Sequence, residues 1–417
     1  MTQEKKHSET GQDCPEGYKS CDGYKIPKEW HIVRFDSLFS RVTRKNDENN
    51  QNVLTISAQQ GLISQIEYYN TLYASENKTG YTLLHRGDFS YNKSYSSGYA
   101  YGAIKRLDAY EKGIVSPLYL CFTPRQGVNS DFYLQYFEAG CFDREIYKIA
   151  QEGARNHGLL NVSTEDFFHS MLVFPPLEEQ ERITEILTQC DHVIELKEQK
   201  LDELKQLKKE FLRKMFPAKG CDTPEIRFPG FTGAWEQRKL GELGTITTGS
   251  TPSTSIPVWV TPTDICENIT FESARKLSDL GQQVGRIVPK NTILVTCIAS
   301  IGKNTMLGNT GSFNQQINGL TPNENECDPY FLLTESALWS AKMKSSAAAG
   351  TMQIVNRTEF SELKTWLPSL IEQQAISDFF RQLDNLITLH QRELEETKTY
   401  KKTLAKLLLT GIVRVQG

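Results

Sequence analysis

The sequence contains no run of about 18 apolar residues, which excludes a helix that spans a membrane. Residues 1–13 are polar and lack the apolar core of a signal peptide, so we expect a cytoplasmic protein. The nine cysteines form an odd set without a Cys-x-x-Cys pair, which argues against zinc ribbons and disulfide frameworks. Cys14 and Cys21 could pair with each other, but two free thiols are the expectation.

Motifs of common DNA-modifying and ATP-using enzymes are also missing. Adenine methyltransferases hold the extruded base with an Asn/Asp-Pro-Pro-aromatic quartet, whereas Phe174-Pro-Pro-Leu177 lacks the polar first residue and the aromatic last one. No phosphate-binding GxxxxGK[ST] loop occurs, because Gly302-Lys303 is followed by Asn304. The seven histidines are dispersed without the spacing of a zinc site. These absences favour a binding protein over an enzyme, and we expect neither a catalytic residue nor a metal site.

The composition permits two or three folded domains but is unusual for a protein that binds nucleic acid. Of the 417 residues, 38% are hydrophobic, 24% charged and 10% aromatic, which is enough apolar material for real cores. The net charge is −4 and the isoelectric point is about 6.1. This acidic average argues against a lone nucleic-acid binder, unless basic faces are local or partners supply the phosphate contacts.

The chain repeats itself at a spacing of about 193 residues. The sequence FPPLEEQERITEILTQCD begins at Phe174, and LPSLIEQQAISDFFRQLD begins at Leu367. The two copies share the pattern Pro-x-Leu-x-Glu-Gln, an isoleucine and a final aspartate. Because a proline precedes a helical pattern in both copies, each copy indicates the start of a helix.

Apolar residues after each proline recur at steps of three and four, which predicts two amphipathic helices of about 38 residues, or roughly 55–60 Å. Lys197 and Lys208 interrupt the first series where His390 and Lys401 interrupt the second. An apolar seam on a charged helix must be buried, and the simplest partner is the other copy; alternatively, each helix lies on its own domain. The residues expected in a helix–helix seam are Ile183, Leu187, Ile194, Leu201, Leu204, Phe211, Ile376, Phe380, Leu383, Ile387, Leu394 and Leu404.

A second repeat frames the region before each helix, so the order is head, rod, head, rod. This order has pseudo-two-fold character, which suits a target with two half-sites. The matched sequences are Pro27–Trp30 with Gly233–Trp235, Phe35–Leu38 with Leu240–Leu243, and Asn161 to Phe167 with Asn356 to Phe360. The expected boundaries are a flexible segment at 1–23, a first head at 24–174, a first helix at 175–216, a linker at 217–230, a second head at 231–367, and a second helix with its tail at 368–417.

The first head combines short strand patterns with turns, and residues 118–124 are expected to form a buried strand. Residues 81–106 are rich in cations and tyrosines, which favours contacts to phosphates and base edges; the alternative is a β-meander with half-buried tyrosines. A turn at 153–157 offers partners for guanine and adenine, or is a solvated loop. The candidates for DNA contact in this head are Arg86, Lys93, Tyr95, Tyr99, Lys105, Arg106, Arg155, Asn156 and His157.

The second head contains a basic stretch from 275 to 303 and a buried strand expected at 293–297. The sequence SFNQQINGL, which begins at Ser312, places amides beside apolar residues. Buried amides must pair internally or face a polar ligand, and both possibilities stay open at this point. The candidates for DNA contact in this head are Arg275, Lys276, Arg286, Lys303, Asn314, Gln315 and Gln316.

Four further sequences are shared with one known family: PEIRFPGFTGAWEQRKLGEL from Pro224, TTGSTPS from Thr247, SFNQQING from Ser312, and LLTGIVRV from Leu408. Together with the doubled helix start, they make the chain resemble the specificity subunits of type I restriction-modification enzymes, from Tyr24 to Val415. The doubled helix start is the most specific part of this resemblance. The first head lacks the Gln-Gln-Ile-Asn element, so the two heads are expected to belong to different subclasses.

The resemblance implies an α+β fold in which two mixed α/β target-recognition domains are joined by two long helices, packed as an antiparallel coiled coil. Each domain would read one half of a split sequence in double-stranded DNA. Modification subunits, expected to be two, would dock on the helices and heads, carry S-adenosylmethionine and methylate adenine. Restriction subunits would use ATP and Mg²⁺ to translocate and cleave DNA, so no cofactor is expected on this chain. Two other functions stay open here: a methyltransferase or nuclease with diverged motifs, and a coiled-coil adaptor that binds only proteins.

Overall fold

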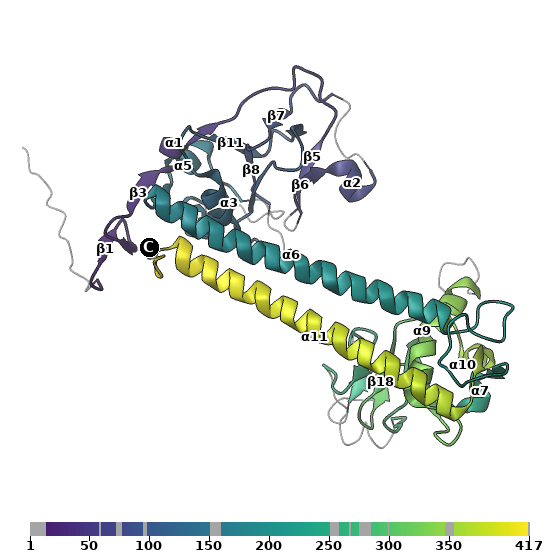
Figure 1. The fold of residues 1–417 in the computed structure, drawn as a ribbon. Coiled ribbons are helices and arrows are strands. Elements are labelled where there is room, and N and C mark those ends of the chain that lie inside the picture. The colour runs from purple at the N-terminus through teal and green to yellow at the C-terminus, as the bar shows by residue number, and fades with distance from the viewer. Residues whose placement is uncertain are drawn as a thin grey trace, which may run out of the picture. The chain divides into compact units, whose positions relative to one another are not determined.

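The computed structural model describes residues 14–57, 60–71, 77–94, 98–150, 160–250, 258–266, 268–274, 285–298, 300–346 and 354–415 (Figure 1). The chain forms two units, of which unit 1 comprises Met1–Leu196 with Glu395–Gly417, and unit 2 comprises Lys197–Leu394. The long helices α6 (Leu177–Lys214) and α11 (Leu370–Leu409) each contribute to both units. We call the part of unit 1 before α6 head 1, and the part of unit 2 between α6 and α11 head 2.

Head 1 is built from short strands and short helices. Its strands are β1 (Tyr18–Cys21), β2 (Tyr24–Pro27), β3 (His31–Arg34), β4 (Phe39–Arg41), β5 (Leu54–Ser57), β6 (Gly61–Ser64), β7 (Thr82–His85), β8 (Phe89–Asn92), β9 (Ala103–Arg106), β10 (Lys112–Val115), β11 (Leu120–Pro124) and β12 (Met171–Phe174). Its helices are α1 (Phe35–Leu38), α2 (Gln65–Tyr69), α3 (Ser130–Glu138), α4 (Asp143–Ile149) and α5 (Thr164–His169). Strands β4, β11, β8 and β9 form an antiparallel sheet in that order, and four two-stranded pairs surround it: β1–β2, β3–β12, β5–β6 and β7–β10.

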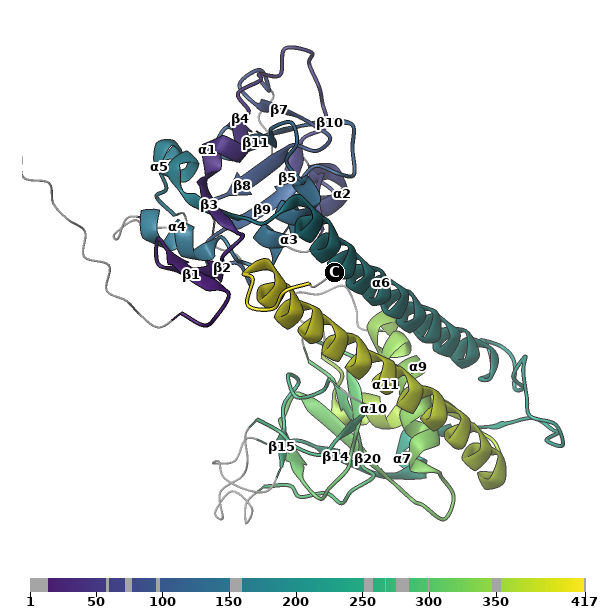
Figure 2. The same cartoon turned by 60° about the vertical axis from the view of Figure 1, so that its left-hand side comes forward.

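The core of head 1 is aromatic and extends onto both long helices. The ring of Phe35 lies 4.9 Å from that of Phe122 and 4.8 Å from that of Phe167, and all three side chains are fully buried. Helix α3 packs beside β9 (Figure 2). The same core includes Ile183 of α6 and Leu408 of α11. Burial of each such side chain contributes about 1.5–3 kcal/mol, so these ends of the helices are part of the fold of unit 1.

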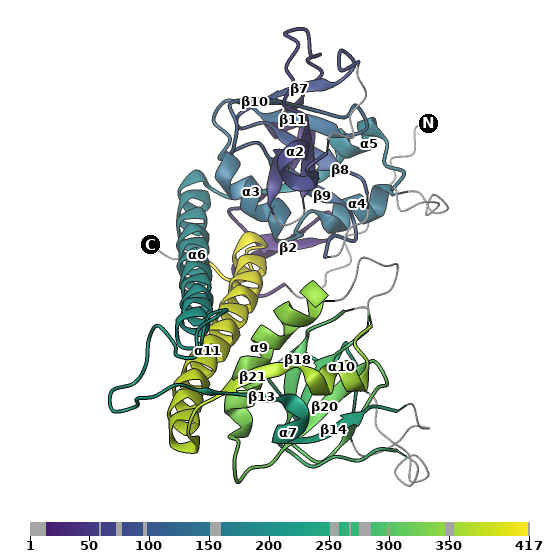
Figure 3. The ribbon, with the colours of Figure 1, turned by 90° about the vertical axis from the view of Figure 1, so that its right-hand side faces the viewer.

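Head 2 has a larger central sheet and fewer surrounding pairs. Its strands are β13 (Glu236–Lys239), β14 (Gly244–Thr248), β15 (Trp259–Val260), β16 (Ile269–Thr270), β17 (Ile293–Thr296), β18 (Asn304–Leu307), β19 (Ser312–Phe313), β20 (Ile317–Pro322) and β21 (Lys364–Leu367). Its helices are α7 (Leu240–Leu243), α9 (Pro329–Ser346) and α10 (Arg357–Glu362). The sheet order is β14-β20-β17-β18-β16, with β16 parallel to β18, and the pairs are β13–β21 and β15–β19 (Figure 3).

The core of head 2 also extends onto the long helices. Trp339 of α9 is fully buried, and its indole N–H donates to Thr365 Oγ1 over 2.9 Å. Phe216, which follows α6, lies 5.4 Å from Phe331 and 6.1 Å from Phe380 of α11 between ring centroids. Each head is therefore fixed to a part of both helices within its own unit.

The two heads share one set of strand pairings. Phe122 of β11 lies opposite Phe89 of β8, and in the same way Leu320 of β20 lies opposite Ile293 of β17. The pair β3–β12 has its counterpart in β13–β21, and a one-turn helix, α1 or α7, follows β3 and β13. Head 1 adds the pairs β1–β2, β5–β6 and β7–β10, whereas head 2 adds β16 and the pair β15–β19. A common frame therefore carries different insertions.

The repeat near the end of each head is offset from the sequence match. Ser163 Oγ accepts from the N–H of Asp166 at the start of α5, and Asn356 Oδ1 accepts from the N–H of Glu359 at the start of α10, both over 3.0 Å. The match of Asn161 with Asn356 is therefore wrong, since Ser163 is the equivalent residue. Serine and asparagine are interchangeable as N-caps, which conceals the equivalence in the sequence.

The long helices run antiparallel within unit 2, because Lys197 pairs with Glu393 over 2.9 Å while Lys208 pairs with Asp384 over 2.5 Å. In each unit the α6 and α11 stretches lie side by side (Figures 1 and 3). Seam residues expected from the sequence are buried or half-buried. The buried ones are Ile183, Leu187, Leu201, Leu204, Ile376, Phe380, Leu383, Ile387 and Leu394, and the half-buried ones are Ile194, Phe211 and Leu404.

Two expected boundaries change in the structure. Residues 18–21 were expected to be flexible but form β1, and the Tyr18 hydroxyl donates to the carbonyl of Gly411 over 2.9 Å. The predicted linker at 217–230 is tied to unit 2, because Arg227 Nε donates to Glu372 Oε1 over 2.6 Å. The buried strand expected at 293–297 is confirmed as β17, whereas β11 begins only at Leu120, is buried in its first three residues, and leaves Leu118 exposed. Among the described residues, no helix combines the length and the apolar character needed to cross a membrane.

Candidate nucleic-acid interface

Three loops of head 2 meet at one end of its central sheet. The N–H of Ser250 donates to the carbonyl of Phe313 over 2.9 Å, and the N–H of Cys297 donates to that of Gln316 over 2.8 Å. These bonds join the loops that follow β14 and β17 to the loop that precedes β20. We call this surface the loop end of head 2, formed by residues 247–250, 297–298, 300–303 and 312–317.

Two asparagine side chains at the loop end accept hydrogen bonds from within head 2. Asn314 Oδ1 accepts from the N–H of Gln316 over 2.9 Å, and the buried Asn318 accepts from Thr248 Oγ1 over 3.0 Å. Internal pairing, one of the two possibilities from the sequence, therefore holds for these two asparagines. Gln315, in the same loop, is exposed, and an exposed amide can meet a base edge.

Two exposed cations lie at or beside the loop end of head 2. Arg286 Nη1 donates to the carbonyl of Thr248 over 2.7 Å, and Lys303 Nζ donates to that of Pro262 over 3.3 Å. A carbonyl positions a cation without neutralising it, so both groups present positive charge to solvent. The candidates Arg275 and Lys276 lie outside the described residues.

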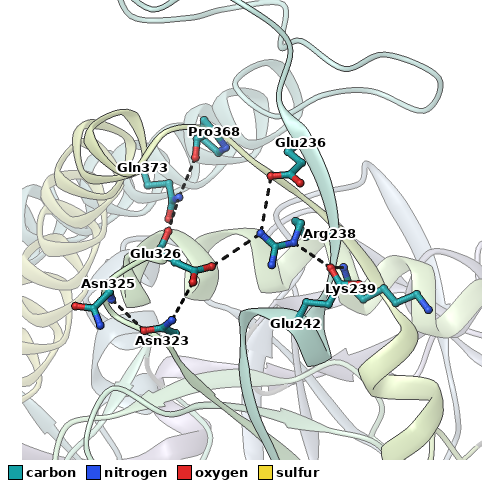
Figure 4. A network of polar contacts seen from close by, with 9 residues as sticks. All are labelled: Glu236, Arg238, Lys239, Glu242, Asn323, Asn325, Glu326, Pro368 and Gln373. Atoms are coloured by element: carbon teal, nitrogen blue, oxygen red, sulfur yellow. Dashed lines mark hydrogen bonds and ion pairs between the residues drawn. The ribbon is translucent and has the colours of Figure 1, made fainter.

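The opposite end of the sheet attaches head 2 to α11 (Figure 4). Arg238 Nε donates to Glu242 over 2.9 Å, and its Nη1 lies 3.9 Å from a carboxylate oxygen of Glu326. The side chain of Gln373 donates to the carbonyls of Glu326 and Pro368, over 3.1 and 2.9 Å. This end is acidic and engaged with the helix, so the loop end is the better candidate for a phosphate-bearing ligand.

Head 1 has an equivalent loop end, where β8 ends and β9 begins. Lys93 Nζ donates to the carbonyl of Val162 over 2.7 Å, and burial lowers the pKa of Lys93. The N–H of Leu160 donates to the carbonyl of Lys93 over 3.0 Å, just as the N–H of Val355 donates to Cys297 in head 2. The candidates Tyr95, Arg155, Asn156 and His157 lie outside the described residues.

Other candidates from the basic stretch of head 1 are internal. Lys105 is 4% exposed, and its Nζ lies 2.6 and 2.7 Å from the two carboxylate oxygens of Glu138 on α3. The Tyr99 hydroxyl donates to the same carboxylate over 3.0 Å, and burial together with Glu138 raises the pKa of Tyr99. These contacts hold α3 against the sheet and give both residues a structural role, while their predicted contact with DNA stays a prediction.

Two arginines of head 1 also have acidic partners. The guanidinium of Arg106 pairs with Asp108 over 2.7 Å and with Asp131 over 2.6 Å, and its side chain is 13% exposed. Arg106 is therefore engaged within head 1, and its predicted contact with DNA stays a prediction. Arg86 is half exposed and pairs with Glu111 over 2.8 Å. Counting charge along the sequence missed Glu138 and Asp131, since both partners come from a later helix.

The lysines that interrupt the apolar seams are paired with carboxylates. In unit 1, Lys401 of α11 pairs with Asp191 of α6. In unit 2, Lys208 of α6 pairs with Asp384 of α11 over 2.5 Å. The two aspartates are the matched final residues of the repeated helix start, so the same pairing occurs once in each unit.

The first glutamate shared by the two helix starts is paired in the same way. Arg414, in the tail after α11, bonds to Glu179 with both Nε and Nη2, over 2.6 and 3.0 Å. Arg227, in the segment after α6, bonds to Glu372 over 2.6 and 2.7 Å. A two-point contact between guanidinium and carboxylate fixes geometry as well as charge. Each arginine therefore ties the segment after one long helix to the start of the other long helix within the same unit.

Comparison with known proteins gives the family. Residues 27–206 and 233–399 both match the model of the type I restriction modification DNA specificity domain. The chain belongs to this family. Among the described residues, no cluster of three or more His, Cys, Asp or Glu side chains could hold a metal ion.

One relative in the family aligns over nearly the whole chain, and another aligns over about a third of it. The type I restriction enzyme MjaVIII specificity subunit of Methanocaldococcus jannaschii is 24% identical over 441 aligned positions, which cover 96% of this chain and 97% of the relative. The HindI specificity subunit of Haemophilus influenzae is 28% identical over 170 residues, or 37% of each chain. These names agree with the resemblance seen in the doubled helix start.

Solved structures support the mixed helix and strand fold. A chain from a study of complex assembly and conformational transition in the type I R-M system matches with a TM-score of 0.61 at 15% identity, covering 94% of this chain and all of the other. The S subunit of a type I restriction-modification system from M. genitalium matches with a TM-score of 0.51 at 14% identity, covering 91% and 96%. At these identities the likeness concerns the fold, and it confirms the α+β class.

Proposed function

We propose that this protein is the non-catalytic specificity subunit of a type I restriction-modification complex and reads a two-part sequence in double-stranded DNA. One observation carries the proposal: two heads with the same strand pairings present different loop ends. A common frame with different contact groups is what two unlike half-sites require. Each head would therefore read one half-site, and the bases between the half-sites would be left unread.

The chemistry of the loop ends is suited to DNA recognition. In head 2, Gln315 would pair with a base edge in the major groove, where glutamine recognises adenine through two hydrogen bonds. Arg286 and Lys303 would contact phosphates and so fix the position of the head. In head 1, Arg155 and Asn156 remain our candidates for base contacts, because arginine and asparagine recognise guanine and adenine in the major groove.

We propose further that α6 and α11 form an antiparallel coiled coil that acts as a spacer with pseudo-two-fold character. The repeated seam and the repeated pairs Asp191–Lys401 and Asp384–Lys208 support this arrangement. Helices of 38 and 40 residues correspond to roughly 57–60 Å at a rise of 1.5 Å per residue. A rod of this length would hold the two half-sites at one spacing.

The helices would also bind two modification subunits. In unit 1, Val193, Leu196 and Tyr400 are exposed apolar residues. In unit 2 the exposed residues at the equivalent repeat positions are Leu386, Leu389 and Leu207. Each of the six immediately precedes a seam position, and in an antiparallel pair such positions lie on the same flank. Exposed apolar groups repeated in this way favour two copies of one partner.

The partner subunits would carry the chemistry. Modification subunits would hold S-adenosylmethionine and methylate adenine in each half-site, and restriction subunits would use ATP and Mg²⁺ to move and cleave DNA. Basic surfaces on these partners would compensate for the net charge of −4 on this chain. Such a complex would act on DNA in the cytoplasm.

Reconstitution with the cognate modification subunits tests the proposal. The complex should methylate adenine at one two-part motif, and neither component alone should do so. Mapping of genomic adenine methylation with and without the gene should reveal the loss of that motif. Methylation or cleavage by the purified chain would favour an enzyme, and a complex that lacks salt-dependent DNA binding would favour a protein adaptor.

A further inference from the structure

In unit 2, one carboxylate joins three helices. Asp384 of α11 is 8% exposed and accepts from Lys208 Nζ of α6 over 2.5 Å. Its second oxygen accepts from the Tyr330 hydroxyl of α9 over 2.9 Å. Burial and the adjacent Asp384 raise the pKa of Tyr330, so the phenol remains a proton donor at neutral pH. The guanidinium of Arg381 lies 4.8 Å over the tyrosine ring and completes the cluster.

In unit 1, Asp191 makes the same three-way contact. One of its oxygens accepts from Lys401 Nζ of α11, and the other accepts from Gln135 Nε2 of α3 over 2.9 Å. Helix α3 belongs to head 1 as α9 belongs to head 2. The carboxylate and the lysine are therefore the same in both units, while the donor from the head is an amide in one and a phenol in the other.

Stability alone does not account for this arrangement. Well-packed apolar residues at partly buried seam positions stabilise a helix pair as well as an ion pair does, or better. A polar pair within an apolar seam instead selects one register, because any shift of the helices leaves a charge without its partner. The contact to α3 or α9 extends this selection from the helices to the head.

We infer that Asp191 and Asp384 are positioning residues, each of which fixes the orientation of its own head on the long helices and so the reading of one half-site. This inference rests on the proposed function. Neither aspartate would touch DNA. Each would act through the head helix that it holds, so its loss would affect the half-site of its own head.

The test uses complete complexes with modification subunits that contain D384N, D191N or neither substitution. Methylation rates are measured at the two half-site adenines of one DNA, each in hemimethylated form. We expect D384N to slow one half-site at least tenfold more than the other, and D191N to show the opposite preference. Equal slowing of both half-sites by either variant, or no slowing at all, would overturn the inference.

Four further variants separate positioning from folding. Y330F removes only the phenol hydroxyl and should reproduce the selectivity of D384N without changing the yield of the complex. K208D should impair the same half-site, and K208D combined with D384K should restore it at least partly. E393Q is the matched control, since Glu393 pairs with Lys197 of α6 across the same two helices. A selective effect in E393Q as large as that in D384N would also overturn the inference.

If the wild-type complex methylates no two-part motif, the proposed function fails before the variants are compared. If the wild type is active and the variants lack selectivity, only the positioning role fails. The two outcomes are therefore distinguishable within one experiment.

Discussion

The ammonium group of Lys105 lies between the sheet of head 1 and α3, where Glu138 accepts from it with both oxygens. Replacement by alanine leaves the Glu138 carboxylate beside the half-buried Tyr99 without its cation. We expect K105A to lower the free energy of unfolding by about 1–3 kcal/mol, measured by urea denaturation. The exposed pair of Lys112 with Glu48 supplies the control, because K112A should change stability by less than about 1 kcal/mol.

Comparison of K105A with K303A distinguishes a structural lysine from a lysine that contacts DNA. Loss of a phosphate contact reduces the salt dependence of DNA binding by about one counterion. K105A should leave that dependence unchanged in the reconstituted complex, whereas K303A should reduce it. A reduced salt dependence in K105A would contradict the structural role of this lysine.

Cysteine reactivity provides a second prediction for individual residues. Burial raises the pKa of the Cys297 thiol to about 11, so little thiolate forms at pH 8, while Cys221 is exposed. Brief treatment of the folded protein with iodoacetamide should alkylate Cys221 and spare Cys297, as measured by mass spectrometry. Both should react in 8 M urea. Equal labelling in the folded state would contradict the buried placement of Cys297.

At the level of elements, the long helices could be predicted from the sequence because one period persists over many turns. The seam residues follow from the same period. The period does not predict the partners of the lysines that interrupt the seam, because paired residues such as Asp191 and Lys401 are distant in the sequence. The common frame of the heads was also hidden, because short strands carry weak periodicity and caps such as Ser163 and Asn356 differ chemically.

The exposed apolar residues of the helices give a prediction for complex assembly. L386K combined with L389K should remove one modification subunit from the complex, because the two lysines place charge on a surface that assembly would bury. V193K combined with L196K should do the same at the equivalent positions. Native mass spectrometry measures the subunit count. Q374K, on an exposed polar position of α11, is the control and should assemble fully.

For the whole molecule, the function could be predicted from the sequence more reliably than the residues of the candidate site. Doubling of the helix start and motifs such as SFNQQING are properties of the chain itself and could be recognised directly. The DNA candidates depended on local charge, which could not show that Lys105 pairs with Glu138 and Arg106 with Asp131, two residues of a later helix. Gln315 and Arg286 remained as candidates because the fold leaves them exposed.

Independence of the two heads is testable on the whole complex. R155A combined with N156A should weaken methylation at one half-site at least tenfold, since a base contact contributes about 1–3 kcal/mol of discrimination. Q315A combined with R286A should weaken the other. Substitution of each base in the motif would map the loss to one half. A uniform loss on all DNA sequences would contradict base reading by these residues.

Unit 1 is completed by the last part of α11 and the tail after it, and this has a consequence for synthesis on the ribosome. Unit 2 is one continuous stretch, whereas unit 1 needs Glu395–Gly417 to complete its core and to supply Arg414 to Glu179. The first head to be translated is therefore the last to be finished. A nascent chain that has emerged only as far as Leu394 holds every residue of unit 2, while unit 1 still lacks the stretch that begins at Glu395.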